Sequence, residues 1–196
     1  MSQVSYPFKF LSTSKTGADK YLQDTLIYSF LSQKSGHQYE VHIERYVGRL
    51  CGVKFFDLST DLQTGKFSQL SGTYEPRTIL RTVAEIALDA YRRDPLSSFF
   101  FVGAADSRDH SASTTRRHRV YATFVHNLEL DDFFRTIELK DVSMSVLVNR
   151  KAVTDVDTYI QDIIDFVRAW MILPQTIGWQ DFNNSGANGT FDPLAE

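Results

Sequence analysis

The sequence predicts one α+β domain whose mixed or mainly antiparallel sheet has six to seven strands, with three main helices. Apolar and polar residues alternate through most of residues 24–58, as expected for half-buried strands. Three later segments instead repeat apolar residues at helical spacing. The expected order is three strands, a helix, a strand, a helix, two strands and a helix. No repeat or linker interrupts residues 5–172 of the 196-residue chain.

The N-terminal part predicts an antiparallel meander. In its first main strand, Leu26, Tyr28 and Phe30 are spaced by two, which places them on one face. Cys51 lies in an apolar run and is interpreted as a buried small hydrophobe. Tight turns are expected at 34–37 and at Gly48. The predicted strands cover residues 24–33, 38–47 and 50–58, with short additional strands at 5–12 and 66–70.

The next segment predicts a helix followed by a central strand. Thr73 is a candidate N-cap, Pro76 suits the first turn, and Asp94-Pro95 ends the helix. The run Ser98–Val102 is apolar on both faces, which predicts a strand covered on both sides. The helix stripe consists of Ile79, Leu80, Val83, Ile86, Ala87, Ala90 and Tyr91.

The remaining elements are a second helix, a hairpin and a third helix. The second helix ends near Leu128, and its predicted inward stripe is Val120, Tyr121, Phe124, Val125 and Leu128. The hairpin strands are 133–139 and 142–149, and Thr154 or Asp155 caps the third helix. Residues 1–172 are therefore expected to form the domain. The Asn- and Gly-rich composition of residues 173–196 predicts a flexible tail.

Composition and charge exclude several classes of protein. The formal net charge is −3, from 21 basic and 24 acidic residues, which counts against a nucleic-acid-binding protein. The apolar runs are too short to span a membrane. A lone cysteine cannot form an intramolecular disulfide, and the N-terminus lacks the pattern of a signal peptide. We therefore expect a cytoplasmic protein.

No common catalytic or metal-binding motif is present. Glycine-rich nucleotide loops and the G-x-S-x-G elbow are missing. His118 and His126 lie two helical turns apart, about 12 Å, which is too far to share one metal ion. We therefore expect no metal site.

One basic segment suggests an anion-binding site. The strand ending at Gly103 leads through a polar loop into a helix that opens with Arg116, Arg117 and Arg119, next to Thr115. Cations at a helix N-terminus oppose the helix dipole, whereas free N–H groups there bind anions. These residues, with the N–H groups at 113–116, are the predicted ligand-binding residues.

Arg117 is the central residue of this prediction. With the apolar stripe directed inward, Arg117 lies on the same face, one turn before Tyr121, while His118 and Arg119 lie to its sides. A buried arginine needs a partner. Two partners stay open: an acid of the preceding loop, Asp106 or Asp109, or the phosphate or carboxylate of a ligand.

Two resemblances follow from these residues. The run Arg117-His118-Arg119-Val120-Tyr121 after Gly103 resembles the R-x-R-[LV]-Y helix start of an uncharacterised family of small bacterial domains, found mainly in Bacteroidetes. That similarity covers roughly residues 38–150 and implies no known activity. The order of elements separately resembles the GNAT acyltransferase fold.

The second resemblance implies acyl transfer with acyl-CoA as cofactor. In that fold, the pyrophosphate of acyl-CoA lies on an R/Q-x-x-G-x-G/A loop that opens the helix after the meander. Residues 70–76 read Leu-Ser-Gly-Thr-Tyr-Glu-Pro at that position, so the signature is absent. Tyr121 lies on the helix that provides a tyrosine general acid in many such enzymes, and His118 is the candidate general base. Tyr121 also completes the apolar stripe, which is its structural interpretation.

The sequence therefore leaves two functions open. The first is a GNAT-like domain that binds a small anionic, phosphate-bearing ligand. The alternative is a non-catalytic accessory protein of bacterial stress or phage defence. That protein would bind a protein partner through Trp179 and Phe182 of the tail.

Overall fold

The computed structural model describes residues 5–15, 21–59, 75–104, 109, 113–153 and 155–167. Within these residues it confirms the α+β class, with seven strands in one mixed sheet and three α-helices. Residues 1–152 form one compact unit, which contains the sheet, α1 and α2, and residues 153–196 form a second, which contains α3. The predicted boundary at 172 and the tail lie outside the described residues.

The observed elements follow the predicted order. Among the described residues, no helix has the length and apolar character that crossing a membrane requires. Asp155 caps α3, as predicted, by accepting a hydrogen bond from the Thr158 N–H at 3.1 Å. The elements are β1 (Phe8–Ser14), β2 (Leu22–Leu31), β3 (Gln38–Tyr46), β4 (Leu50–Asp57), α1 (Pro76–Arg93), β5 (Ser98–Val102), α2 (Arg116–His126), β6 (Phe134–Leu139), β7 (Met144–Asn149) and α3 (Val156–Val167).

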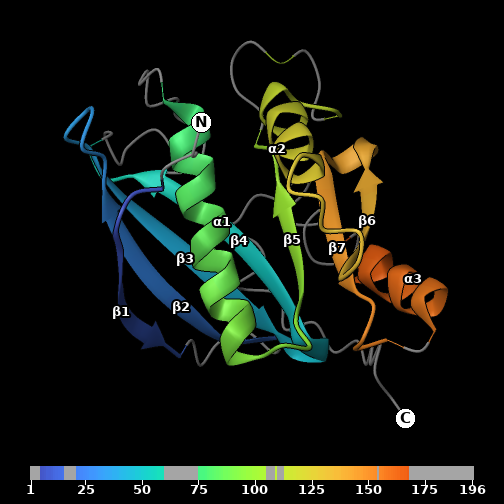
Figure 1. Ribbon diagram of the computed structural model, residues 1–196. Coiled ribbons are helices and arrows are strands. Elements are labelled where there is room, and N and C mark those ends of the chain that lie inside the picture. Colours follow the sequence, from blue (N-terminus) through green and yellow to red (C-terminus); the bar gives the residue numbers. More distant parts are fainter. Residues whose placement is uncertain are drawn as a thin grey trace, which may run out of the picture. The chain divides into compact units, whose positions relative to one another are not determined.

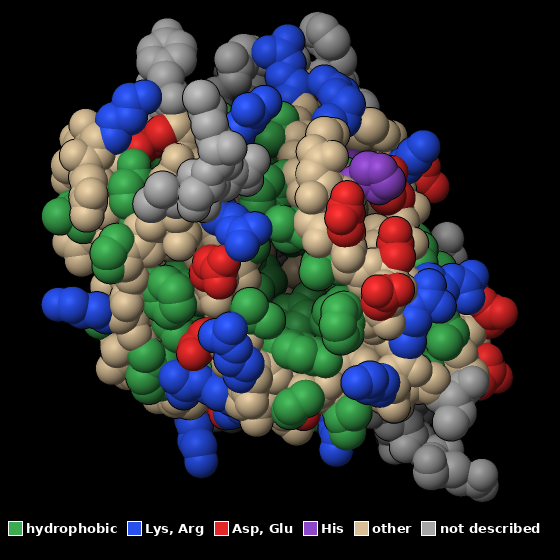
Figure 2. Space-filling model, viewed as in Figure 1, with side chains coloured by type: hydrophobic (Ala, Val, Ile, Leu, Met, Phe, Trp, Pro, Cys, Tyr) green, Lys and Arg blue, Asp and Glu red, His purple; other side chains and the backbone are tan. Residues whose placement is uncertain are grey.

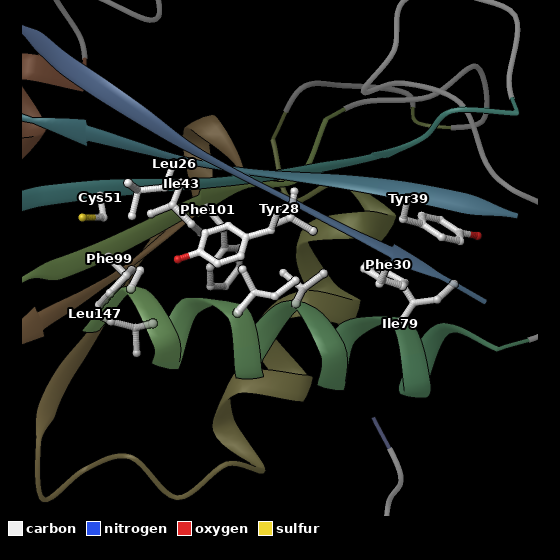
Figure 3. Packing of buried hydrophobic residues seen from close by; sticks show 14 of the residues in the cluster. Leu26, Tyr28, Phe30, Tyr39, Ile43, Cys51, Ile79, Phe99, Phe101 and Leu147 are labelled. Atoms are coloured by element: carbon white, nitrogen blue, oxygen red, sulfur yellow. The ribbon is translucent and has the colours of Figure 1, made fainter. Parts of the chain in front are cut away.

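The strands are ordered β1-β2-β3-β4-β5-β7-β6 across the sheet, and α1 and α2 lie on the same face of it (Figure 1). The predicted alternation is correct. Leu26, Tyr28 and Phe30 of β2 are all buried in the main core cluster, on the face covered by α1. Figure 3 shows Tyr28 and Phe30 directed toward α1, with Ile79 of the helix beside Phe30. Cys51 is also buried there, as predicted.

The parallel pair β4 and β5 is the exception in an otherwise antiparallel sheet. Its pairing runs from Leu50–Ser98 to Gly52–Phe100 and stops there. However, β4 continues to Asp57 and β5 to Val102. The carboxyl ends of these two neighbouring strands therefore extend beyond their shared ladder.

Two sequence predictions need correction. Val120 was expected on the inward face of α2, but it is 50% exposed, whereas His118, expected at the side, is 1% exposed. The helix presents its polar first turn to the sheet, so the buried face is rotated toward residues 117 and 118. The residue at the N-cap of α1 is Glu75, without a side-chain cap bond. Thr73 and the strand expected at 66–70 lie outside the described residues.

Candidate functional site

The start of α2 lies directly against the end of β5, and Gly103 makes this contact possible. A Cβ atom at Gly103 would be 2.3 Å from the backbone nitrogen and 2.6 Å from the Cα atom of His118. The hydroxyl of Thr115 donates to the Gly103 carbonyl at 2.6 Å, and the Gly103 N–H donates to the carbonyl of Ser143 at 2.8 Å. Gly103 and Thr115 therefore hold the helix to the sheet.

The N–H groups proposed to bind an anion already have acceptors within the protein. Thr114 donates to the carbonyl of Lys140, and Thr115 donates to the hydroxyl of Ser143. The N–H of Arg116 donates to the Asp109 carboxylate at 3.0 Å. The N–H groups of residues 114–116 are therefore already hydrogen-bonded within the protein, so an anion here would have to be bound by side chains.

The three arginines differ in burial. Arg117 is 9% exposed and lies inward, as predicted from the helical spacing. Arg116 and Arg119 are exposed, and the Arg119 guanidinium donates to the carbonyl of Thr114 at 2.8 Å. Arg117 is engaged by other groups of the chain. Of its two predicted acidic partners, Asp109 accepts the Arg116 N–H and Asp106 lies outside the described residues.

His118 is enclosed between α2, β5 and β7. Its Nε2 lies 3.0 Å from the hydroxyl of Ser145, and its ring lies 6.5 Å from that of Phe101. Its Nδ1 has no hydrogen-bond partner among the described residues. Burial lowers the pKa of His118, because the charged imidazolium would be poorly solvated. A side chain this enclosed cannot contact a substrate without movement of α2, so its visible role is to anchor the helix.

Tyr121 lies where β4 and β5 have separated. Its ring centroid is 5.8 Å from that of Phe55 on β4 and 5.9 Å from that of Phe101 on β5. Burial raises the pKa of Tyr121, and the positive charge of Arg117 lowers it in part, leaving it above its ordinary value. The phenol is therefore protonated at neutral pH.

The surface above these strands is apolar. Figure 2 shows a hollow near the middle of this face, with hydrophobic side chains in it. Partly buried apolar residues of β4, α1 and α2 pack on the core cluster: Val53, Phe55, Ala87, Tyr91, Tyr121 and Val125. A hollow with apolar side chains suits the apolar part of a ligand. Arg117 lies one helical turn before Tyr121 on α2.

A polar cluster at the start of α1 was not predicted from the sequence. The buried carboxylate of Glu75 accepts hydrogen bonds from Ser32, at 2.5 Å, and from Tyr6. Burial raises the pKa of Glu75, but hydrogen bonds from Ser32, Tyr6 and Ser35 outweigh it and leave the pKa lowered. These residues come from three separate segments, so no sequence spacing connects them.

An open pocket of about 360 Å³ adjoins this cluster. It is lined by Tyr6, Lys34, Glu75, Pro76, Arg77 and Thr78. The anionic Glu75 stands at the position where the resemblance to acyltransferases would place a glycine-rich phosphate loop. Among the described residues, no group of three histidine, cysteine or acidic side chains is arranged to hold a metal ion. Comparisons with protein-family models, curated proteins and solved structures found no match to this chain.

Proposed function

We propose that this chain is a GNAT-like domain that binds an anionic, phosphate-bearing ligand, with acyl transfer as its chemistry. The observation that supports this most is the separation of β4 from β5 beneath Tyr121. Ligands of open α/β sheets bind at the carboxyl ends of parallel strands. Here those ends extend past their shared ladder, beside an apolar hollow.

Arg117 and Tyr121 would have different roles in this reaction. Arg117 would contribute positive charge for the anionic group of the ligand, with Arg116 and Arg119 on the exposed side. A nucleophile X–H would attack the acyl carbonyl of a thioester, forming the X–acyl bond as the carbon–sulfur bond breaks. Tyr121 would donate its proton to the leaving thiolate and recover one from solvent, while a base accepts the proton of X–H.

Calorimetry with acetyl-CoA, CoA and ADP tests the binding proposal. Replacing Arg117 by Gln should weaken binding by about 10- to 100-fold, because a hydrogen bond to a charged group contributes roughly 1.5–3 kcal/mol. The matched control is Arg92→Gln, an exposed arginine near the end of α1. Tyr121→Phe should retain binding and lose transfer. Absence of heat with all three ligands, or equal binding by both arginine variants, would contradict the proposal.

One observation supports the non-catalytic alternative. Glu75 places an ionised, buried carboxylate at the N-terminus of α1, where it repels an anion. An accessory protein has no need of phosphate binding at that position. Size-exclusion chromatography with light scattering on the full chain tests this alternative. A stable oligomer together with no CoA binding supports it, and a monomer that binds acetyl-CoA contradicts it.

A further inference from the structure

A second histidine, His37, is paired with a carboxylate. Nδ1 of His37, in the turn between β2 and β3, lies 2.6 Å from Oδ2 of Asp57, the last residue of β4. The Asp57 side chain is 5% exposed, whereas that of His37 is 34% exposed. A buried carboxylate therefore holds an imidazole that reaches solvent.

Both members of this pair are fixed by further hydrogen bonds. The other carboxylate oxygen of Asp57 accepts the Ser59 N–H at 2.8 Å. The His37 N–H donates to the hydroxyl of Ser35 at 3.3 Å, and the His37 carbonyl accepts the Ser32 N–H at 2.9 Å. Ser32 is itself bound to Glu75 at the start of α1. The imidazole is thus held directly by β4, and the backbone of its residue is linked through Ser32 to the start of α1.

This arrangement determines which ring nitrogen is available. In the neutral imidazole, Nδ1–H donates to the carboxylate and the free lone pair is on Nε2. Among the described residues, no group hydrogen-bonds to Nε2 of His37, and its side chain is partly exposed. A carboxylate on Nδ1 that orients the ring and stabilises the imidazolium is the arrangement found in histidine bases of acyl-transfer enzymes.

We propose that His37 is a general base and that Asp57 is its positioning residue. Alternation along β4 places Val53, Phe55 and Asp57 on one face, the face on which Phe55 contacts Tyr121. The base and the candidate acid therefore flank the end of the same strand. The nature of the transferred group rests on the proposed function, whereas the role of His37 as a base does not.

In the proposed step, Nε2 of His37 accepts the proton of the attacking X–H as X bonds to the acyl carbonyl carbon. The bond from that carbon to the leaving group then breaks, with the electron pair going to the leaving group. The imidazolium afterwards releases its proton to solvent. His118, the base expected from the sequence, is enclosed and bound to Ser145, so His37 takes that role in the proposal.

The chain contains a second histidine–carboxylate pair, which serves as a control for a purely structural role. Nε2 of His42 lies 2.5 Å from Glu40, two residues away on the same strand. The His42 ring packs edge-on against Phe56, 5.3 Å away, on the opposite sheet face from Phe55. This pair has a carboxylate and a histidine but lies away from Tyr121.

Hydrolysis of p-nitrophenyl acetate by the full chain tests the base directly. Water is then the nucleophile, acetate and p-nitrophenolate are the products, and no CoA site is needed. His37→Gln should lower the protein-dependent rate by about 10²-fold or more. Asp57→Asn should lower it while leaving the imidazole in place. His42→Gln and His126→Gln should leave it unchanged.

Two further measurements separate catalysis from folding. His37→Gly should regain rate on addition of imidazole, which a structural role would not produce, and the wild-type rate should fall in heavy water. Equal rates for His37→Gln and His42→Gln, or no protein-dependent rate at all, would overturn the proposal. If acetyl-CoA does not bind but His37-dependent cleavage persists, the proposed function fails and the base stands. If acetyl-CoA binds and cleavage ignores His37, the base assignment fails.

Discussion

Replacing Gly103 by alanine should separate α2 from the sheet. The new Cβ atom would lie 2.3 Å from the backbone nitrogen of His118, about 1 Å short of the 3.4 Å at which ordinary contact begins. The obstructing atoms are backbone, so the helix start itself must move. Overpacking of this kind costs roughly 1–3 kcal/mol.

The same movement disrupts the hydrogen bonds that hold the helix. The 2.6 Å bond from Thr115 to the Gly103 carbonyl and the 3.0 Å bond between His118 and Ser145 would both lengthen. Each hydrogen bond contributes about 1 kcal/mol. We therefore expect Gly103→Ala to lower the free energy of unfolding by about 3–5 kcal/mol in total. For a chain of this size, that corresponds to a fall in Tm of roughly 6–20 °C.

Urea unfolding followed by circular dichroism measures this change, and Gly36→Ala is the matched control. Gly36 has a φ of 73°, but no atom lies within 4 Å of the position that its Cβ would take, so alanine there meets conformational strain alone. That strain costs about 1–2 kcal/mol. The close contact of α2 with Gly103 is refuted if the free energy of unfolding of Gly103→Ala lies within about 0.5 kcal/mol of the wild-type value. It is also refuted if Gly103→Ala is no less stable than Gly36→Ala.

Three further predictions concern buried groups. Because the pKa of His118 is lowered in the folded protein, the unfolded chain binds more protons, so stability should decrease as the pH falls below about 6.5. His118→Gln should reduce that slope in urea titrations at several pH values. Burial raises the pKa of the Cys51 thiol to about 11, so a thiol reagent at pH 8 should label it only after unfolding. The pKa of Glu75 is lowered, so its stabilisation is present at neutral pH and lost in acid. Glu75→Gln should therefore cost about 1–3 kcal/mol at pH 7 by thermal unfolding, and less in acid.

The fold was predictable because its strands and helices follow simple periodicities. Alternation in β2 and β3 and the apolar stripe of α1 are set by burial against one core, which a sequence records residue by residue. The orientation of α2 is different. Its apolar pattern suggests that Val120 is buried, but the contact through Gly103 and the bond from His118 to Ser145 rotate the polar first turn inward.

The candidate site was only partly predictable, because some of its contacts form only in the folded sheet. The inward direction of Arg117 follows from helical spacing, and the structure places it on the buried face. The contact of Tyr121 with both β4 and β5 depends on where their ladder stops, which no local pattern encodes. The pairing of His37 with Asp57 joins residues from a turn and a strand end, through a register that forms only in the folded sheet.

The burial of Arg117 supplies a further argument about its role. A cation in the first turn of a helix is opposed by the helix dipole, and its burial adds a desolvation cost. If Arg117 only secures the preceding loop, its removal leaves a buried partner charge unpaired, and Arg117→Gln should lose several kcal/mol of stability. If its charge serves a ligand, the same variant should keep most of its stability and lose binding. Unfolding and calorimetry on this one variant therefore distinguish a structural arginine from a ligand-binding one.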